Sequence, residues 1–412
     1  MNVRAEEGRD EFMAQIMGLP VFDTHTHLVG DRLGARDFWE LAHYFWLLRE
    51  MQAGGYPANA AELPEEERIR AFLAAYRATR STLMNWAFTA TLRDLYGIEL
   101  RDAESVRQAD EAIRRSGASP TWAQEVADRL GIRRFVVNHP EHAAFLGMRE
   151  PAVILPRIDG RIGQWTDEVA ASLNPAQTLE EVGATIAALF ASYRASGCPG
   201  IMTTLPRYET SARETRPIGP NASRDEILME LLHRICAEAE RSGLLVQLFL
   251  GVERSWCGTA VPANDTSRIL KLSALFEHYS CQFELVLASE LNNLDAVQAA
   301  WNFPNVHVGG MWWFNFRAST YRDSMQYRLE ALPAAKSSLV VSDARGMEWC
   351  YGKILLVKRL AGEFLWERLT SGWIDRETAL RTAREWLCDS AARRYGLAEA
   401  ETRVRDDEGA SA

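Results

Sequence analysis

Cysteine pairs, long apolar runs and basic clusters are all missing from this sequence, and each absence excludes a class of protein. The six cysteines are scattered without a C-x-x-C pair, so neither a zinc knuckle nor a disulfide framework is expected. No run approaches the roughly 18 apolar residues that a membrane-spanning helix needs. The charged N-terminus also lacks the apolar segment of a secretory signal. We therefore expect a cytoplasmic protein with reduced thiols and no membrane partner.

The charge pattern argues against nucleic-acid binding. The formal net charge is -10, and the acidic and basic residues are spread along the chain, so no basic stripe could follow a phosphate backbone. With 412 residues, of which 47% are hydrophobic, the chain can bury a large core. We expect a small-molecule partner, and the oligomeric state is left open, a homo-oligomer included.

Eight short apolar or β-branched runs, each bounded by turn residues, predict an α/β architecture. Most are separated by helical patterns, which is typical of βα units and a parallel sheet. The runs are 19–27, 131–138, 152–158, 198–205, 243–250, 283–289, 305–314 and 338–345. Eight such strands predict a closed (β/α)8 barrel of the TIM type, formed by one domain over residues 1–412.

The first two runs are separated by about 100 residues, far more than a βα loop contains. Residues 37–49 and 65–96 repeat apolar positions at helical spacing, which predicts a helical insertion over about 33–125. Active sites of such barrels lie at the C-terminal ends of the strands, so this insertion would form a cap over the site. A helical C-terminal extension is expected over about 347–400.

His25 and His27 alternate along the first predicted strand. Side chains two residues apart on a strand point to the same side, which in a barrel strand can be the interior mouth. Two imidazoles would then converge on one point and could hold a divalent metal. Asp23, one alternation deeper, could accept the other ring N–H of a ligating histidine.

The last predicted strand ends in an acid, Asp343, followed two positions later by Arg345. Because the first and last strands of a closed barrel are neighbours, Asp343 could reach a metal held by His25 and His27. Two imidazoles and a carboxylate suit Zn²⁺, with Mn²⁺ or a similar ion as the alternative. We therefore predict one divalent metal bound by these three residues, with the positive charge of Arg345 beside it.

Other strand ends carry candidates for substrate binding. One of Trp312 and Trp313 is expected to line the pocket while the other packs behind it. Arg157 lies at the end of the third run and Arg207 follows the fourth, where they could face the same mouth or form exposed salt bridges.

Taken together, these motifs resemble those of the uronate isomerase (glucuronate isomerase) family, a divergent branch of the amidohydrolase superfamily. The resemblance runs over nearly the whole chain, and although the H-x-H pair alone marks only the superfamily, the tryptophan pair is specific to the isomerases. The segments that carry it are Phe22-Asp23-Thr24-His25-Thr26-His27-Leu28, His43-Tyr44-x-Trp46-x-x-Arg49, Leu92-x-x-Leu95-Tyr96-Gly97-Ile98, Leu155-Pro156-Arg157, Leu205-Pro206-Arg207-Tyr208, Trp312-Trp313-Phe314-Asn315 and Ser342-Asp343-Ala344-Arg345.

The resemblance implies an enzyme of carbohydrate metabolism that interconverts aldouronic and ketouronic acids, such as glucuronate and fructuronate, with one divalent metal. Asp343 would also transfer a proton, Arg345 would bind oxygen beside the reacting carbons, and Arg157 would hold the sugar carboxylate. Two residues of the predicted cap, His43 and Tyr44, would reach into the site as further catalytic groups.

Three departures from the family pattern bear on the reaction, and one of them is that the segment Met84-Asn85-Trp86-Ala87-Phe88-Thr89 lacks a histidine. Where the family has a histidine facing the metal at the end of the fifth strand, this chain has Phe249, which can neither ligate nor donate. After the second strand an acidic motif is replaced by a segment containing His139. This histidine could be a replacement ligand, a base, a substrate contact or an ordinary loop residue.

Three functions follow from these observations. The leading hypothesis is a metal-dependent isomerase of a uronic acid of the glucuronate or galacturonate type, which works by proton transfer through an enediolate. The second is a diverged hydrolase or lyase of the same superfamily that acts on another carboxylated substrate. The third is a sugar-acid binding protein without activity.

Overall fold

The contacts within the chain divide it into two compact units. The computed structural model describes residues 3–30, 32–139, 145, 147–214, 217–254, 260–262, 265–312 and 315–397. The first unit comprises Met1–Phe135, Glu141–Ala152 and Ser342–Trp366, and the second comprises Val136–Pro140, Val153–Val341 and Glu367–Ala412. All three predicted metal ligands belong to the first unit.

The first unit is mainly helical. Its strands are β1 (Val21–Thr26) and most of β2 (Ile132–Val137), which are neighbours in a sheet. Its helices are α1 (Val3–Gly18), α2 (Phe38–Ala42), α3 (Phe45–Ala53), the 3-10 turn η1 (Ala60–Glu62), α4 (Glu65–Ala78), α5 (Leu83–Tyr96), α6 (Ala103–Gly117), α7 (Trp122–Leu130) and most of α14 (Met347–Thr370).

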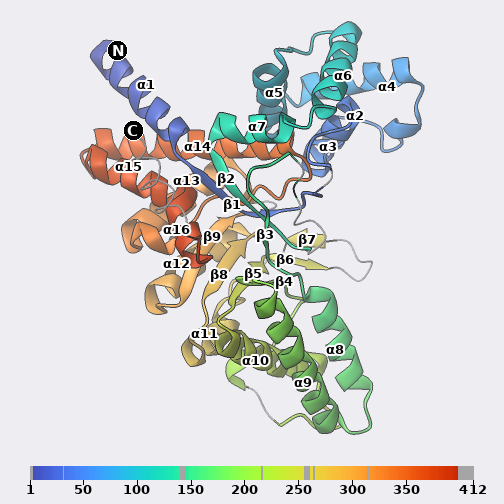
Figure 1. The fold of residues 1–412 in the computed structure, drawn as a ribbon, viewed down its shortest axis with the longest axis vertical. Helices are drawn as coiled ribbons and strands as arrows, with labels where there is room; N and C mark the ends of the chain where they lie inside the picture. The colour runs from blue at the N-terminus through green and yellow to red at the C-terminus, as the bar shows by residue number, and fades with distance from the viewer. Residues whose placement is uncertain are drawn as a thin grey trace. The chain divides into compact units, whose positions relative to one another are not determined.

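The range 33–125 contains α2 to α6, which pack on one another and are drawn in blue to cyan in Figure 1. Asp102 caps α6 by accepting the backbone N–H of Ser105, and the Ser105 hydroxyl oxygen accepts the backbone N–H of Asp102 in return. The local sequence therefore defines where this helix begins. That these helices cover an active site stays a prediction. None of the helices described in the chain is long and apolar enough to cross a membrane.

The second unit contains a four-stranded parallel sheet in the order β4 (Gly200–Thr204), β5 (Leu245–Leu250), β8 (Phe283–Leu287) and β9 (Val306–Met311). The end of β2 pairs in parallel with β3 (Val153–Ile154), and β6 (Val252–Arg254) forms an antiparallel pair with β7 (Ala260–Pro262).

The helices of this unit alternate with its strands, and Figure 1 shows α8, α9 and α10 side by side in green. The helical segments are α8 (Asp159–Ala171), α9 (Pro175–Ala195), α10 (Arg224–Ser242), α11 (Ser273–His278), α12 (Asn293–Asn302), α13 (Ala318–Ala331), α15 (Arg376–Arg384) and α16 (Ser390–Arg394), the short 3-10 segments η3 (Ala212–Glu214), η4 (Leu270–Leu272), η5 (Glu290–Asn292) and η7 (Ala334–Lys336), and the π-helical η8 (Glu385–Asp389).

Two of the eight predicted strands differ in the structure. Run 152–158 yields only the two residues of β3 and an isolated bridge between Arg157 and Met202. Pro156 interrupts the ladder because it has no N–H to donate, although its carbonyl accepts a hydrogen bond from Met202.

Run 338–345 is not a regular strand, so the predicted closed barrel is seen only in part, as parallel sheets of an α/β protein. Ser338 donates to the carbonyl of Val308, but the next N–H, that of Leu339, bonds to the carbonyl of Trp386 instead of to a strand. At the other end of the run Asp343 has a φ of 52°, outside the range of a strand.

The central strands β5 and β8 are buried at every residue and are almost wholly apolar, as expected for strands covered on both faces. The exceptions are Gln247 and Glu284, both fully buried. Glu284 accepts hydrogen bonds from Gln247, Tyr395 and Ser338 and forms an ion pair with Arg394 at 2.9 Å, in which both side chains are at most 1% exposed. The charge is therefore compensated locally.

Removing that compensation should be costly. We expect Glu284→Gln to lower the free energy of unfolding by about 3 kcal/mol, because it leaves the buried Arg394 without a counter-charge. The control is Glu377→Gln, which breaks the exposed Glu377–Arg381 pair and should cost at most about 1 kcal/mol. Urea titration of both variants measures the difference, and equal stabilities would show that the buried pair contributes nothing net.

Candidate functional site

His25 and His27 lie where β1 ends, and their rings meet edge to face. Strand β1 is buried along its whole length, and His27 follows its last residue. The imidazole of His25 is 2% exposed and that of His27 29% exposed. Their ring centroids lie 4.9 Å apart with an interplanar angle of 84°. The predicted convergence of the two side chains is therefore observed, with one ring buried and the other reaching solvent.

Asp343 joins the two histidines from the segment before α14. Its Oδ1 atom lies 3.4 Å from Nε2 of His25 and 3.1 Å from Nε2 of His27. Two backbone hydrogen bonds hold this segment beside β1, from Asp343 N–H to the His25 carbonyl at 2.9 Å and from His27 N–H to the Ala344 carbonyl at 2.8 Å. Backbone pairing thus delivers the carboxylate to the imidazoles.

The environment keeps Asp343 ionised. Burial by itself would raise the pKa of the carboxyl, but hydrogen bonds from His25 and His27 and the positive charge of Lys353 hold that pKa well below its usual range. A carboxylate can ligate a cation only in its ionised form, which the charge of Lys353 favours, whereas each Nε2 would have to give up its proton and its hydrogen bond to Asp343 in order to ligate.

The three donor atoms fit a divalent metal ion. With ligand bonds of about 2.0–2.1 Å in tetrahedral geometry, neighbouring donor atoms lie about 3.3 Å apart. The two distances to Asp343 match that spacing, and all three candidate ligand atoms lie within 4.8 Å of one another. Three protein ligands leave a coordination position for water or substrate, as in catalytic sites. The group formed by His25, His27 and Asp343 could therefore hold a metal.

Asp23 contacts backbone groups rather than an imidazole in the hydrogen bonds found for it. Its Oδ1 accepts the N–H of Ser342 at 3.0 Å and of His25 at 3.4 Å, while its Oδ2 has no hydrogen-bond partner among the described residues. Burial raises the pKa of Asp23 to about 6, against the lowering effect of these hydrogen bonds. Asp23 thus ties β1 to the segment that carries Asp343.

The two candidates from the predicted cap have different surroundings. Tyr44, which is 6% exposed, donates its hydroxyl to the carbonyl of Asp343 at 2.9 Å and stacks on Trp349 at 4.4 Å. His43 ends α2, where its Nε2 lies 2.8 Å from the hydroxyl of Tyr56. Burial lowers the pKa of His43, which favours the neutral ring. Tyr44 therefore contacts the segment that carries Asp343 directly, whereas His43 contacts Tyr56, between α3 and η1.

The three predicted arginines differ in exposure and in ion pairing. Arg345 is exposed in the bend before α14. In the second unit Arg157 forms a two-pronged ion pair with Asp159, at 2.5 and 2.9 Å. A sugar carboxylate would have to compete with Asp159 for this guanidinium.

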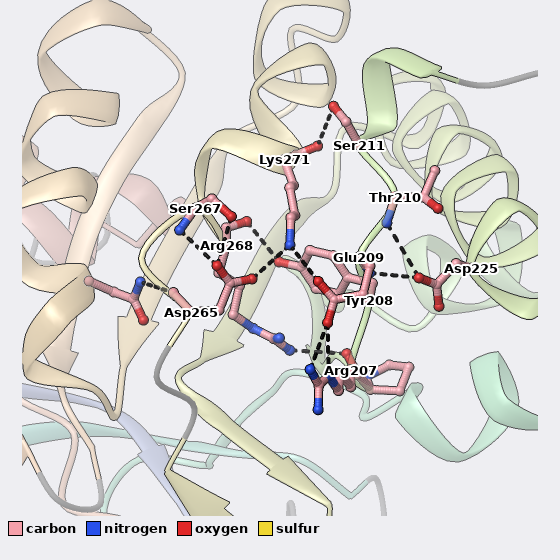
Figure 2. Close-up of polar contacts among 12 residues, drawn as sticks. Arg207, Tyr208, Glu209, Thr210, Ser211, Asp225, Asp265, Ser267, Arg268 and Lys271 are labelled. Atoms are coloured by element: carbon pink, nitrogen blue, oxygen red, sulfur yellow. Dashed lines mark hydrogen bonds and ion pairs between the residues drawn. The ribbon is translucent and has the colours of Figure 1, made fainter.

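Arg207 lies in a charged network after β4. It is exposed and pairs with Glu209 at 2.9 Å, and Glu209 in turn contacts Lys271, as Figure 2 shows. The fully buried Arg268 donates to the carbonyl of Pro206 at 3.0 Å and so orders the chain just before Arg207. These contacts explain the position of Arg207 by local ion pairing.

Trp312 packs edge-on against Phe249, with ring centroids 4.9 Å apart and an interplanar angle of 89°. Trp312 Nε1 is buried and has no hydrogen-bond partner among the described residues, whereas Phe249 is 1% exposed. His139 is exposed two residues after the end of β2. Trp313 lies outside the described residues. An aromatic pair therefore stands where the family resemblance would place a histidine.

Sequence reasoning missed Lys353, which lies on α14, the helix that follows Asp343. Lys353 is 1% exposed, and its ammonium donates to the carbonyl of Ser342 at 2.5 Å and to the hydroxyl of Tyr44 at 2.8 Å. A lysine within the apolar part of a predicted helix is the signal that could have revealed it, because a lysine is rarely buried without partners.

Comparison with known proteins supports the fold. No family model and no curated protein matches the chain. Among solved structures it is similar to a uronate isomerase from Bacillus halodurans (18% identity, TM-score 0.74, covering 98% of this chain and 100% of that one) and to a glucuronate isomerase from Caulobacter crescentus (14%, 0.76, 96% and 95%). A proposed metal-dependent hydrolase from Lactobacillus casei is also similar (12%, 0.61, 93% and 97%). At these identities the likeness establishes the fold.

Metal content tests the site. We expect about one divalent ion per chain in the purified protein, lost in a His25→Ala/His27→Ala double variant. His233 and His278, whose rings face each other 6.2 Å apart in the second unit, provide a matched control, and their double alanine variant should keep the metal. Elemental analysis after dialysis measures the content. Wild-type protein that takes up no zinc would refute the site.

The raised pKa of Asp23 predicts a pH dependence of stability in the metal-free protein. A carboxyl with a folded pKa of about 6 and an unfolded value near 3.8 binds more protons when folded. The contribution of Asp23 to the free energy of unfolding is therefore fully present below about pH 4 and is lost as pH rises through 6, by an amount on the order of 3 kcal/mol. Urea titrations of the chelator-treated wild type and Asp23→Asn should show this loss as a smaller fall of stability with pH in the variant. An equally steep fall in that variant would contradict the assignment.

Proposed function

We propose that the chain is a metal-dependent aldose–ketose isomerase acting on a uronic acid of the glucuronate or galacturonate type. The observation that carries the proposal is the group formed by His25, His27 and Asp343 at the end of β1. Support comes from the nearly full-length likeness to solved structures described as uronate and glucuronate isomerases.

Aldose–ketose exchange needs a base that moves a proton between C2 and C1 and a positive group that stabilises the enediolate oxygen. A divalent metal held by the three ligands would polarise the substrate oxygens. Asp343 is ionised and contacts both imidazoles through Oδ1, which leaves its Oδ2 as the proposed proton carrier. The exposed guanidinium of Arg345, two residues on, is proposed to bind a substrate oxygen.

The remaining assignments belong to the same proposal. Zn²⁺ is the proposed ion, since two imidazoles and a carboxylate suit it. A closed (β/α)8 barrel with the helices of 33–125 as its cap is the proposed architecture over residues 1–412, followed by a helical extension. Tyr44 and His43 are proposed as further catalytic groups. Proposed substrate contacts are Arg157 with the sugar carboxylate, and Trp312, Trp313, Arg207 and His139 around the pocket.

A second candidate function is hydrolysis or a lyase reaction on another carboxylated substrate. The observation that favours it is the Phe249–Trp312 pair, because an aromatic ring replaces an imidazole that the resemblance would place at the metal. A hydrolase needs from the protein an ion that activates water and a carboxylate that takes its proton, and the same three residues could provide both.

Turnover of uronates separates the two candidates. Metal-loaded protein incubated with glucuronate or galacturonate should produce the ketose, followed by NMR. Asp343→Asn should lose at least about 100-fold in kcat, because the proposed proton carrier is gone. The control is Asp375→Asn, which replaces one good N-cap of α15 by another and should keep full activity. No ketose from either sugar, with metal bound, would refute the isomerase and favour the second candidate.

A further inference from the structure

Lys353 is a buried cation in the same unit as the candidate metal ligands, and the proposed reaction does not use it. It projects from α14 and is 1% exposed. Its ammonium lies over the rings of Trp46 and Tyr44, at 4.3 and 5.0 Å from their centroids. Burying an ammonium is costly unless hydrogen bonds and counter-charges replace its water, so its partners indicate what it does.

The partners of Lys353 surround one residue, Asp343. The ammonium donates to the carbonyl of Ser342, directly before Asp343, at 2.5 Å. It also donates to the hydroxyl of Tyr44 at 2.8 Å, and that hydroxyl donates to the carbonyl of Asp343 at 2.9 Å. Lys353 therefore holds the peptide group before the aspartate directly and the one after it through Tyr44.

Asp343 needs such support because its backbone is strained. Its φ of 52° makes it the one residue other than glycine with a positive φ among those the structure describes. The left-handed conformation is unfavourable for residues with a Cβ atom, by roughly 1–2 kcal/mol. It persists only where surrounding contacts over-determine it, and here it turns the carboxylate toward the two imidazoles.

We propose that Lys353 is a positioning residue for the metal ligand Asp343, acting through Tyr44 and the Ser342 carbonyl to hold the left-handed backbone that points the carboxylate at His25 and His27. This role rests on the metal site of the proposed function, but not on the identity of the substrate. Groups that orient a ligand typically change metal affinity by about 10- to 100-fold when removed.

The same helix offers a matched control. Lys358 is as buried as Lys353 and donates to three backbone carbonyls, those of Met17, Leu19 and Leu130, at 2.6–2.7 Å. None of these carbonyls belongs to the metal-ligand segment. Loss of Lys358 therefore reproduces the structural cost of losing a buried lysine on α14 without disturbing Asp343.

Lys353→Met and Lys358→Met should both unfold at lower urea concentration than wild type. Only Lys353→Met should weaken zinc binding, by about 10- to 100-fold in a competition titration with a chromophoric chelator. Its Co²⁺-loaded form should also show a changed visible absorption spectrum, which reports ligand geometry. Wild-type zinc affinity in Lys353→Met, or an equal loss in Lys358→Met, would overturn the proposal.

Tyr44→Phe tests the connection and keeps the proposal open to refutation if Lys353→Met does not fold. It removes one hydroxyl and keeps the ring that stacks on Trp349, so the fold should persist. We expect weaker zinc binding in this variant. Because Lys353 and Tyr44 would act along the same path, the losses of zinc-binding free energy in the two single variants should be less than additive in the double variant. Unchanged zinc affinity in Tyr44→Phe would overturn the role of Tyr44 as the link.

These measurements separate the failure of this inference from failure of the proposed function. Normal zinc binding in wild type with no turnover of either uronate would refute only the isomerase reaction. Normal turnover by the wild type, together with unchanged zinc affinity in Lys353→Met and Tyr44→Phe, would refute only the role of Lys353. Wild-type protein that binds no metal would refute both.

Discussion

The candidate site depends on a short stretch of backbone pairing between the end of β1 and the segment before α14. Two hydrogen bonds, Asp343 N–H to His25 and His27 N–H to Ala344, bring the carboxylate beside both imidazoles. The Asp23 carboxylate adds a third link, to Ser342. Because a metal accepts its ligands only within a narrow range of distances, this pairing is what makes three separate side chains into one site.

Buried charge is compensated locally in each unit. Lys353 and Lys358 each donate to backbone carbonyls in the first unit, while Arg328 does so at the carbonyls of Gly309 and Ser338 in the second. Glu284 has Arg394 as its counter-charge. Along 338–345, Lys353 binds the carbonyl of Ser342 and Arg328 that of Ser338, so two of these cations satisfy backbone groups of a segment that is not a regular strand. Lys353 and Arg328 therefore replace part of the hydrogen bonding that a regular last strand would provide.

The candidate metal ligands do not by themselves distinguish between the two proposed reactions. The donor set of two imidazoles and a carboxylate suits isomerisation and hydrolysis alike, because both need a polarised oxygen and a proton carrier. Among the proposed substrate contacts, Trp312 packs on Phe249 and Arg157 is paired with Asp159. Under the proposed function, specificity would depend on such residues and not on the donor set itself.

The sequence by itself determined the alternation of apolar runs and helices, and with it the α/β class, since strand and helix periods are local properties. It also determined that His25 and His27 face one side of a strand. It could not show that Asp343 adopts a left-handed backbone that interrupts the last strand, or that Tyr44, 299 residues away, donates to its carbonyl. Only the tertiary structure decided these, because hydrogen bonds and burial between distant segments leave no periodic pattern in the chain.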